Sequence, residues 1–185
     1  FKLAKAVLNA IRSVALKNID GLILMNHGVL TFDDEAKASY EKMIRITSQA
    51  ETFLRVRGAL DAVAKDTPVE NLVDLSAVRR KVSEINGTAT LTCLDSSPEA
   101  CGFSGLKDVQ SIVIRGPITP DHAIRIKPAP VIINKEIETS LSDFASAYQT
   151  YFGRHTDGSQ SMLDPAPAWG VWPGVGTLSF GRSLE

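Results

Sequence analysis

Apolar residues recur every three or four positions near the start of the chain and again after residue 33, which is the spacing of amphipathic helices. The first pattern predicts a helix from Leu3 to about Leu16. The second predicts a helix reaching residue 57, which starts after the acidic run 33–35 and buries a stripe of Ala36, Tyr40, Met43, Ile44, Thr47, Ala50 and Leu54. Two short apolar runs between the helices, 21–25 and 29–32, predict two strands joined by a tight turn at Asn26-His27-Gly28.

The second half of the chain alternates short strand patterns with helix starts. Positions 88–94 alternate with a period of two, which places Ala89, Leu91 and Cys93 on one face and three threonines on the other. This pattern predicts a half-buried strand with Cys93 in the core. Further strands are predicted at 109–115, 131–133, 169–172 and 177–180, and helices at Ser76, Ser97 and Ser140. Residues 58–69 read as a connection. The fold class expected is α/β and three-layer αβα-like, with a mixed, largely antiparallel sheet flanked by helices.

Two segments of the chain match each other at a constant offset of 148 residues. When 22–34 is laid over 170–182, glycine, leucine and phenylalanine coincide at 28/176, 30/178 and 32/180. Each segment is a strand, a glycine turn and a strand that follow an amphipathic helix. We interpret the pair as a degenerate duplication, in which Val175 stands where the first copy has His27.

Composition narrows the class of protein. The 185 residues are 44% hydrophobic and 22% charged, with a net charge of -1, which is ordinary for a globular domain. A basic excess that would indicate a nucleic-acid partner or an anionic membrane is absent from the sequence. Two cysteines are too few for a disulfide scaffold. We expect a cytoplasmic protein that can form homo-oligomers. A first residue of Phe1 and a final Leu-Glu pair favour a piece excised from a longer chain.

Histidines and cations supply the candidate chemistry. His27, on a turn beside a glycine, is either a metal ligand or a polar hairpin residue. His122, Arg125 and Lys127 follow a proline-rich turn and are either an anion or sugar-phosphate site or parts of a shaped turn. His155 at a predicted helix end favours a capping or solvent-exposed role.

The segment Gly21-Leu-Ile-Leu-Met-Asn-His-Gly-Val-Leu-Thr-Phe32, followed by an acidic helix start, resembles the C-terminal signature of the class II aldolase/adducin family. The resemblance implies that His27 is the third ligand of a catalytic zinc, whose other two histidines come from an upstream H-x-H. The zinc of this family acts as a Lewis acid in the aldol cleavage of sugar phosphates. The resemblance places the catalytic glutamate outside this chain, so no catalytic residue is assigned here and no zinc is expected on the isolated chain.

The second half carries three motifs: Arg115-Gly-Pro-Ile-Thr-Pro-Asp-His122, Met162-Leu-Asp-Pro-Ala-Pro167 and Pro173-Gly-Val-Gly176. Together they resemble the middle of bacterial fusion proteins in which a class II aldolase precedes a short-chain dehydrogenase, of the rhamnulose-1-phosphate aldolase/lactaldehyde (alcohol) dehydrogenase type. By this resemblance residues 1–60 end an aldolase-like domain. Residues 61–185 form a degenerate aldolase-like unit, and an NAD(P)-binding domain follows the chain. The fragment alone is then expected to be inactive.

Two other classes of function remain open. An adducin-like scaffold would keep the fold without the chemistry. A sugar-phosphate sensor would bind its ligand near His122, Arg125 and Lys127.

Overall fold

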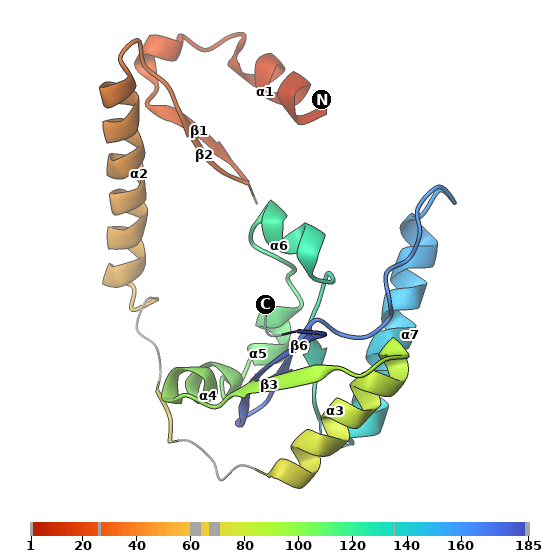
Figure 1. The fold of residues 1–185 in the computed structure, drawn as a ribbon. Helices are drawn as coiled ribbons and strands as arrows, with labels where there is room; N and C mark the ends of the chain where they lie inside the picture. The colour runs from red at the N-terminus through yellow and green to blue at the C-terminus, as the bar shows by residue number, and fades with distance from the viewer. Residues whose placement is uncertain (1, 26, 60–63, 67–70, 135, 184–185) are drawn as a thin grey trace. The chain divides into compact units, whose positions relative to one another are not determined.

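A computed structural model describes residues 2–25, 27–59, 64–66, 71–134 and 136–183, so Asn26 and parts of the predicted connection 58–69 lie outside the described residues. The chain divides into two compact units, residues 1–61 and residues 62–185 (Figure 1). Each unit is described by itself below.

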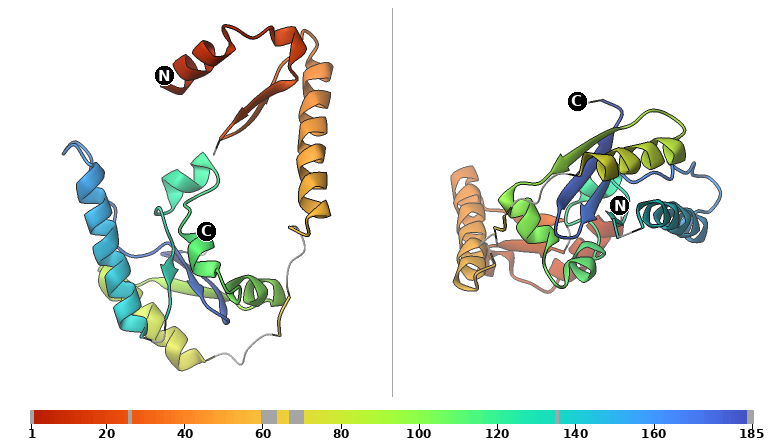
Figure 2. Two further views of the ribbon diagram at one scale, coloured as in Figure 1. Left: turned by 180° about the vertical axis from the view of Figure 1, so that it is seen from behind. Right: turned by 90° about the horizontal axis from the view of Figure 1, so that it is seen from below.

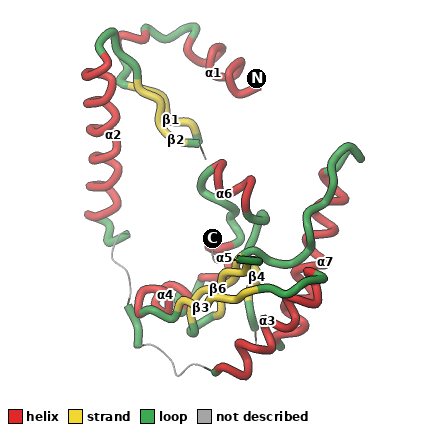
Figure 3. The backbone as a smooth tube through the Cα atoms, viewed as in Figure 1, coloured by secondary structure: helices red, strands yellow, loops and turns green. Residues whose placement is uncertain are grey.

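Unit 1 is a β-hairpin packed against a long helix. Its elements are α1 (Lys2–Ile11), η1 (Leu16–Asn18), β1 (Gly21–Leu24), β2 (Gly28–Thr31) and α2 (Ala36–Val56). The strands pair antiparallel, and the tube in Figure 3 shows them as one narrow ribbon. Polar contacts tie the hairpin to α2: the Thr31 hydroxyl donates to the Ser39 carbonyl at 2.9 Å, and Lys42 pairs with Asp33 at 2.7 Å. The predicted elements of this region are therefore present, but α1 ends at Ile11 and not near Leu16 as predicted.

The predicted buried stripe of α2 is wrong for the described part of unit 1, where no residue is buried. Tyr40 keeps 65% of its surface exposed and Ile44 keeps 48%. The hairpin is too narrow to cover the whole apolar stripe. The half-buried residues of the helix include Met43 from the predicted stripe and two polar neighbours, Ser39 and Lys42.

Unit 2 is built on a four-stranded sheet in the order β3-β6-β5-β4. β6 pairs antiparallel with both β3 and β5, whereas β4 pairs parallel with β5. The predicted mixed, largely antiparallel sheet is thus confirmed. The elements of this unit are α3 (Leu72–Asn86), β3 (Leu91–Asp95), α4 (Pro98–Ser104), α5 (Val109–Val113), α6 (Pro120–Arg125), β4 (Val131–Ile132), α7 (Ile137–His155), β5 (Trp169–Trp172) and β6 (Gly176–Gly181).

Helices cover both faces of this sheet, as a three-layer fold requires. On one face, side chains of α3 and α7 form the main core with the strands: Val78, Val82, Val131, Ile133, Leu141, Ala166 and Leu178. Figures 1 and 2 both show α3 and α7 side by side, and Arg80 of α3 pairs with Glu138 of α7 at 2.6 Å. On the other face, Val109 and Val113 of α5 pack on Val171 of β5. Apolar burial on both faces is the main stabilising contribution.

The prediction of a strand at 109–115 is wrong, because residues 109–113 form the short helix α5. Val109 and Val113 lie one helical turn apart, and both are buried against Val171. The tertiary packing of these two valines therefore overrides the strand preference of a β-branched run.

The prediction of which face of β3 is buried is also wrong. Leu91 and Cys93 lie on the exposed side, whereas Thr92 and Leu94 point inward and Thr90 is buried at 3% exposure. The α3 helix makes burial of Thr90 tolerable because Ser83 accepts a hydrogen bond from its amide and Asn86 donates one to its hydroxyl.

Two predicted helix starts also move toward the N-terminus. The cap of α3 is Asn71, whose side chain accepts from two backbone amides, and not Ser76. Helix α7 begins at Ile137, before the predicted Ser140. The predicted start at Ser97, which caps α4, is confirmed.

Candidate functional site

His27 lies in the three-residue turn between β1 and β2, and its side chain is exposed. Its backbone amide donates to the Leu24 carbonyl at 3.0 Å, which closes the turn. Gly28 follows with a φ of +142°, a conformation that side-chain-bearing residues rarely adopt. Among the described residues other than its chain neighbours, none has an atom within 4 Å of the position that a Cβ on Gly28 would take. The turn therefore presents an exposed imidazole.

The β5–β6 hairpin of unit 2 has the same register at the same offset of 148. Gly21↔Thr31 and Leu24↔Gly28 in the first hairpin correspond to Trp169↔Ser179 and Trp172↔Gly176 in the second. The second turn is closed by the Val175 amide, which donates to the Trp172 carbonyl at 2.9 Å. Gly176 has a φ of +149°. The two segments that match in sequence thus adopt the same hairpin geometry.

The two turns differ in what surrounds them. The second turn is packed against α4, where the Cys101 thiol donates to the Val175 carbonyl at 3.2 Å and the Gly174 amide donates to the Ser104 carbonyl at 3.2 Å. A Cβ on Gly176 would lie 2.1 Å from the Asp95 carbonyl oxygen. The first turn carries an exposed histidine, whereas α4 and the end of β3 pack against the second turn.

Lys127 is the most enclosed cation among the described residues of unit 2. Its residue surface is 7% exposed. Its ammonium lies 3.6 Å from an Asp164 carboxylate oxygen and 5.2 Å from the centre of the Tyr148 ring. Burial lowers the pKa of Lys127, and the charge of Asp164 opposes that shift. Burial also raises the pKa of Tyr148, and the nearby Asp164 carboxylate adds to the increase.

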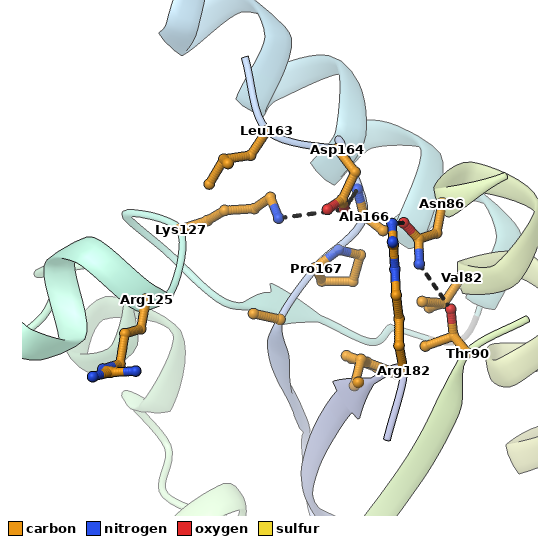
Figure 4. Close-up of a pocket in the computed structure, with 13 residues that line it drawn as sticks. Val82, Asn86, Thr90, Arg125, Lys127, Leu163, Asp164, Ala166, Pro167 and Arg182 are labelled. Atoms are coloured by element: carbon orange, nitrogen blue, oxygen red, sulfur yellow. Dashed lines mark hydrogen bonds and ion pairs between the residues drawn. The ribbon is translucent and has the colours of Figure 1, made fainter. Parts of the chain in front are cut away.

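Lys127 lines a pocket of about 170 Å³ beside the end of β6 (Figure 4). Arg125 and Arg182 line it too, together with Asn86 and Asp164. In Figure 4 the Lys127 side chain points toward Asp164, while the Arg125 guanidinium points away from that pair. Arg182 extends along the pocket and donates to the Asn86 amide oxygen at 3.4 Å. The structure thus brings Arg125 and Lys127 to one cavity.

His122 does not line this pocket. Its Nδ1 lies 2.7 Å from the hydroxyl of Thr119, the residue that caps α6. His155 is in the last turn of α7 and packs on Tyr151, with 4.7 Å between the ring centres. Asp164 and Arg182 were not anticipated as pocket residues, because each follows a segment whose pattern indicated only a loop or a strand end.

Among the residues that the structure describes, no group of three or more histidine, cysteine or carboxylate side chains could hold a metal ion. The histidine at the first hairpin is a suitable zinc donor by chemistry, and its exposure leaves it free to share an ion with other ligands.

The structure shows a mixed α/β fold, and comparison with known families assigns the chain to a family. The family model described as aldolase class II, second domain, matches residues 70–185, so the chain belongs to this family. A relative in Bacillus subtilis (strain 168) is named uncharacterized oxidoreductase YuxG. It is 25% identical over an alignment 185 positions long, gaps included, which covers 88% of this chain and 27% of that protein. The chain thus spans about a quarter of the length of that relative.

No solved structure matches the chain. Within the described residues, every helix is too short or too polar to cross a lipid bilayer.

Proposed function

We propose that this chain is the middle segment of a bifunctional enzyme, which combines zinc-dependent aldol cleavage of a sugar phosphate with NAD(P)-dependent short-chain dehydrogenase activity. Residues 1–60 end the catalytic aldolase domain, and residues 61–185 form the second, degenerate aldolase-like domain that leads to the dehydrogenase. The observation that carries the proposal is the pair of matched hairpins, in which the first turn has the exposed His27 and the second has Val175 at the same position.

Three further observations support this assignment. The second-domain family match starts at residue 70, after the segment that carries the His27 turn. The Bacillus subtilis relative is named an oxidoreductase and is much longer than this chain. The exposed apolar side chains of α2, such as Tyr40 and Ile44, form a surface suited to packing against the remainder of an aldolase domain.

In this proposal His27 donates one of three imidazole ligands to the zinc. Gly28 has no side chain to crowd the ion, and the Leu24 carbonyl holds the turn through the His27 amide. When bound, zinc would supply Lewis-acid polarisation of the substrate carbonyl. The isolated chain has one donor of this set, so we expect it to be inactive and to hold no stoichiometric zinc.

The test uses the full-length parent protein with His27→Ala, and His155→Ala as a matched control at an exposed histidine of unit 2. We expect His27→Ala to lose zinc and cleavage activity while dehydrogenase activity remains, because a three-ligand site rarely survives the loss of a ligand. The control variant His155→Ala should keep its zinc, its cleavage activity and its dehydrogenase activity. Retention of zinc and cleavage by His27→Ala would refute the metal assignment. One tightly bound zinc per isolated chain would refute the proposal that the other two zinc ligands lie outside this chain.

An adducin-like binding module is the alternative. The exposed apolar surface of α2 favours it, because such a surface also suits a protein partner. The parent protein decides between the two: an H-x-H upstream of this segment and a zinc-dependent cleavage activity favour the enzyme, whereas their absence favours the scaffold.

A further inference from the structure

The pocket at Lys127 carries a local excess of positive charge in a chain that is nearly neutral. Three cations line it, Arg125, Lys127 and Arg182, against one carboxylate, Asp164. The chain as a whole has a net charge of -1. A cavity that gathers cations favours an anion, because the low-dielectric walls strengthen the attraction.

Lys127 has unused capacity for an acceptor. An ammonium carries three donors, and its distance of 3.6 Å to Asp164 is long for a direct hydrogen bond. Burying such a group is unfavourable unless it is paired and hydrogen-bonded, as the lowered pKa of Lys127 indicates. An anion placed between Lys127 and Arg182 would supply the missing acceptors.

The geometry of Arg182 suits a phosphate group. Its guanidinium can form two parallel hydrogen bonds to phosphate oxygens, and its present partner is the neutral amide oxygen of Asn86 at 3.4 Å. Because Asn86 is uncharged, an entering anion replaces a weak contact with a stronger one. The net charge of about +2 from the four ionisable side chains matches a phosphate dianion.

The size and walls of the pocket limit the ligand. Its volume of about 170 Å³ is similar to that of an engineered cavity known to accept benzene, ~150 Å³. A phosphate with a short carbon chain fits a space of this size. Apolar side chains of Val82, Leu163 and Pro167 line the same pocket and could contact the carbon atoms.

We propose that this pocket binds a small phosphomonoester, with Lys127 and Arg182 holding the phosphate and Arg125 contributing from the rim. Asp164 keeps the Lys127 ammonium in place when the pocket is empty. Every residue that lines the site belongs to unit 2, and the proposal does not depend on the proposed zinc chemistry.

The test is a titration of the full 185-residue chain with glycerol 3-phosphate, inorganic phosphate and glycerol at constant ionic strength, followed by ¹H–¹⁵N NMR. We expect saturable shifts at the amides of Lys127, Ala166 and Arg182. Glycerol 3-phosphate should bind more tightly than inorganic phosphate, and glycerol should not bind.

Variants assign the binding to this pocket. Arg182→Gln should weaken phosphomonoester binding by about tenfold or more, since a hydrogen bond to a charged group is lost. Arg125→Gln should weaken it by only about two- to fivefold, as expected for an exposed ion pair. Arg115→Gln, which removes the same charge from an exposed residue outside the pocket, is the matched control and should leave binding unchanged. Lys127→Met keeps the apolar stem and should abolish binding, provided that the tryptophan fluorescence of β5 stays native.

Three results would overturn the proposal: no saturable shifts at millimolar phosphomonoester, full affinity in Arg182→Gln, or an equal loss in Arg115→Gln. If inorganic phosphate binds as tightly as glycerol 3-phosphate, the ester preference is wrong. None of these results bears on His27, so they are distinct from failure of the proposed aldolase function.

Discussion

Gly176 has no room for a side chain, whereas its counterpart Gly28 does. Both glycines open the second strand of a matched hairpin, with φ values of +149° and +142°. An alanine Cβ at Gly176 would lie 2.1 Å from the Asp95 carbonyl oxygen, and one at Gly28 would have no described residue beyond its chain neighbours within 4 Å. The two alanine variants therefore share the backbone strain and differ in the steric clash.

The structure sets the size of each effect. Placing alanine in a glycine-only conformation costs about 1–3 kcal/mol at either position. The clash at Gly176 involves backbone on both sides, so β3 and β6 must move apart, which adds about 1–3 kcal/mol. We expect Gly176→Ala to lower the free energy of unfolding of unit 2 by about 2–6 kcal/mol, the sum of these two costs. At a slope of ~2 kcal/mol/M, this moves the urea midpoint by about 1–3 M.

Tryptophan fluorescence makes the assay specific to one unit. The chain has two tryptophans, and both Trp169 and Trp172 lie in β5. Urea unfolding followed by their emission therefore reports on unit 2 alone. Gly176→Ala should shift that transition strongly, and Gly28→Ala should leave it in place because Gly28 belongs to unit 1.

The reasoning is refuted if Gly176→Ala unfolds within about 0.5 kcal/mol of the parent chain, which is the range of a neutral surface substitution. It is also refuted if Gly28→Ala shifts the tryptophan transition as far as Gly176→Ala does, because the two units would then not respond separately.

Three other outcomes are expected. Leu141→Ala, at a fully buried position of α7, should lower the stability of unit 2 by about 2–5 kcal/mol in urea, whereas Leu163→Ala, at an exposed position, should have little effect. In the native chain a thiol reagent should label Cys93 rapidly and Cys101, which is 1% exposed, only upon unfolding; equal rates would contradict the burial pattern of β3 and α4. Because burial lowers the pKa of Lys127 in the fold, the unfolded chain holds that proton to higher pH, so stability should rise with pH between the lowered pKa and the ordinary value of 10.5. The difference in unfolding free energy between the parent chain and Lys127→Met, measured across that window, should show this rise, and a flat difference would disprove it.

Local sequence patterns were sufficient to predict the two hairpins. Each is a pair of short apolar strands around a glycine, so the pairing partner lies a few residues away and the turn fixes the register. The constant offset between the hairpins appears in the sequence through Gly28 and Gly176, and the structure reproduces it pair by pair.

Long-range packing decided the features that sequence reasoning missed. A period of two identified β3 but could not tell which face meets a helix, and the polar partners Ser83 and Asn86 on α3 allow Thr90 to be the buried side chain. The pocket likewise joins Lys127 to Asp164 and Arg182, which are distant along the chain. Sequence spacing indicated Arg125 and Lys127 as cations of one site, but it gave no means of finding the carboxylate opposite them.

The position of β5 and β6 in the sheet has a consequence for the order of folding. Both edge strands, β3 and β4, depend on this C-terminal hairpin for their pairing: β3 pairs with β6, and β4 pairs with β5. Cys93 of β3 can pair only when Ser179 of β6 is available, and closing the long loop between these two residues slows folding. During synthesis on the ribosome, α3, β3 and α7 emerge before any strand partner exists. The unit can complete its sheet only after the last described strand has been made, and until then the unpaired β3 remains exposed to aggregation.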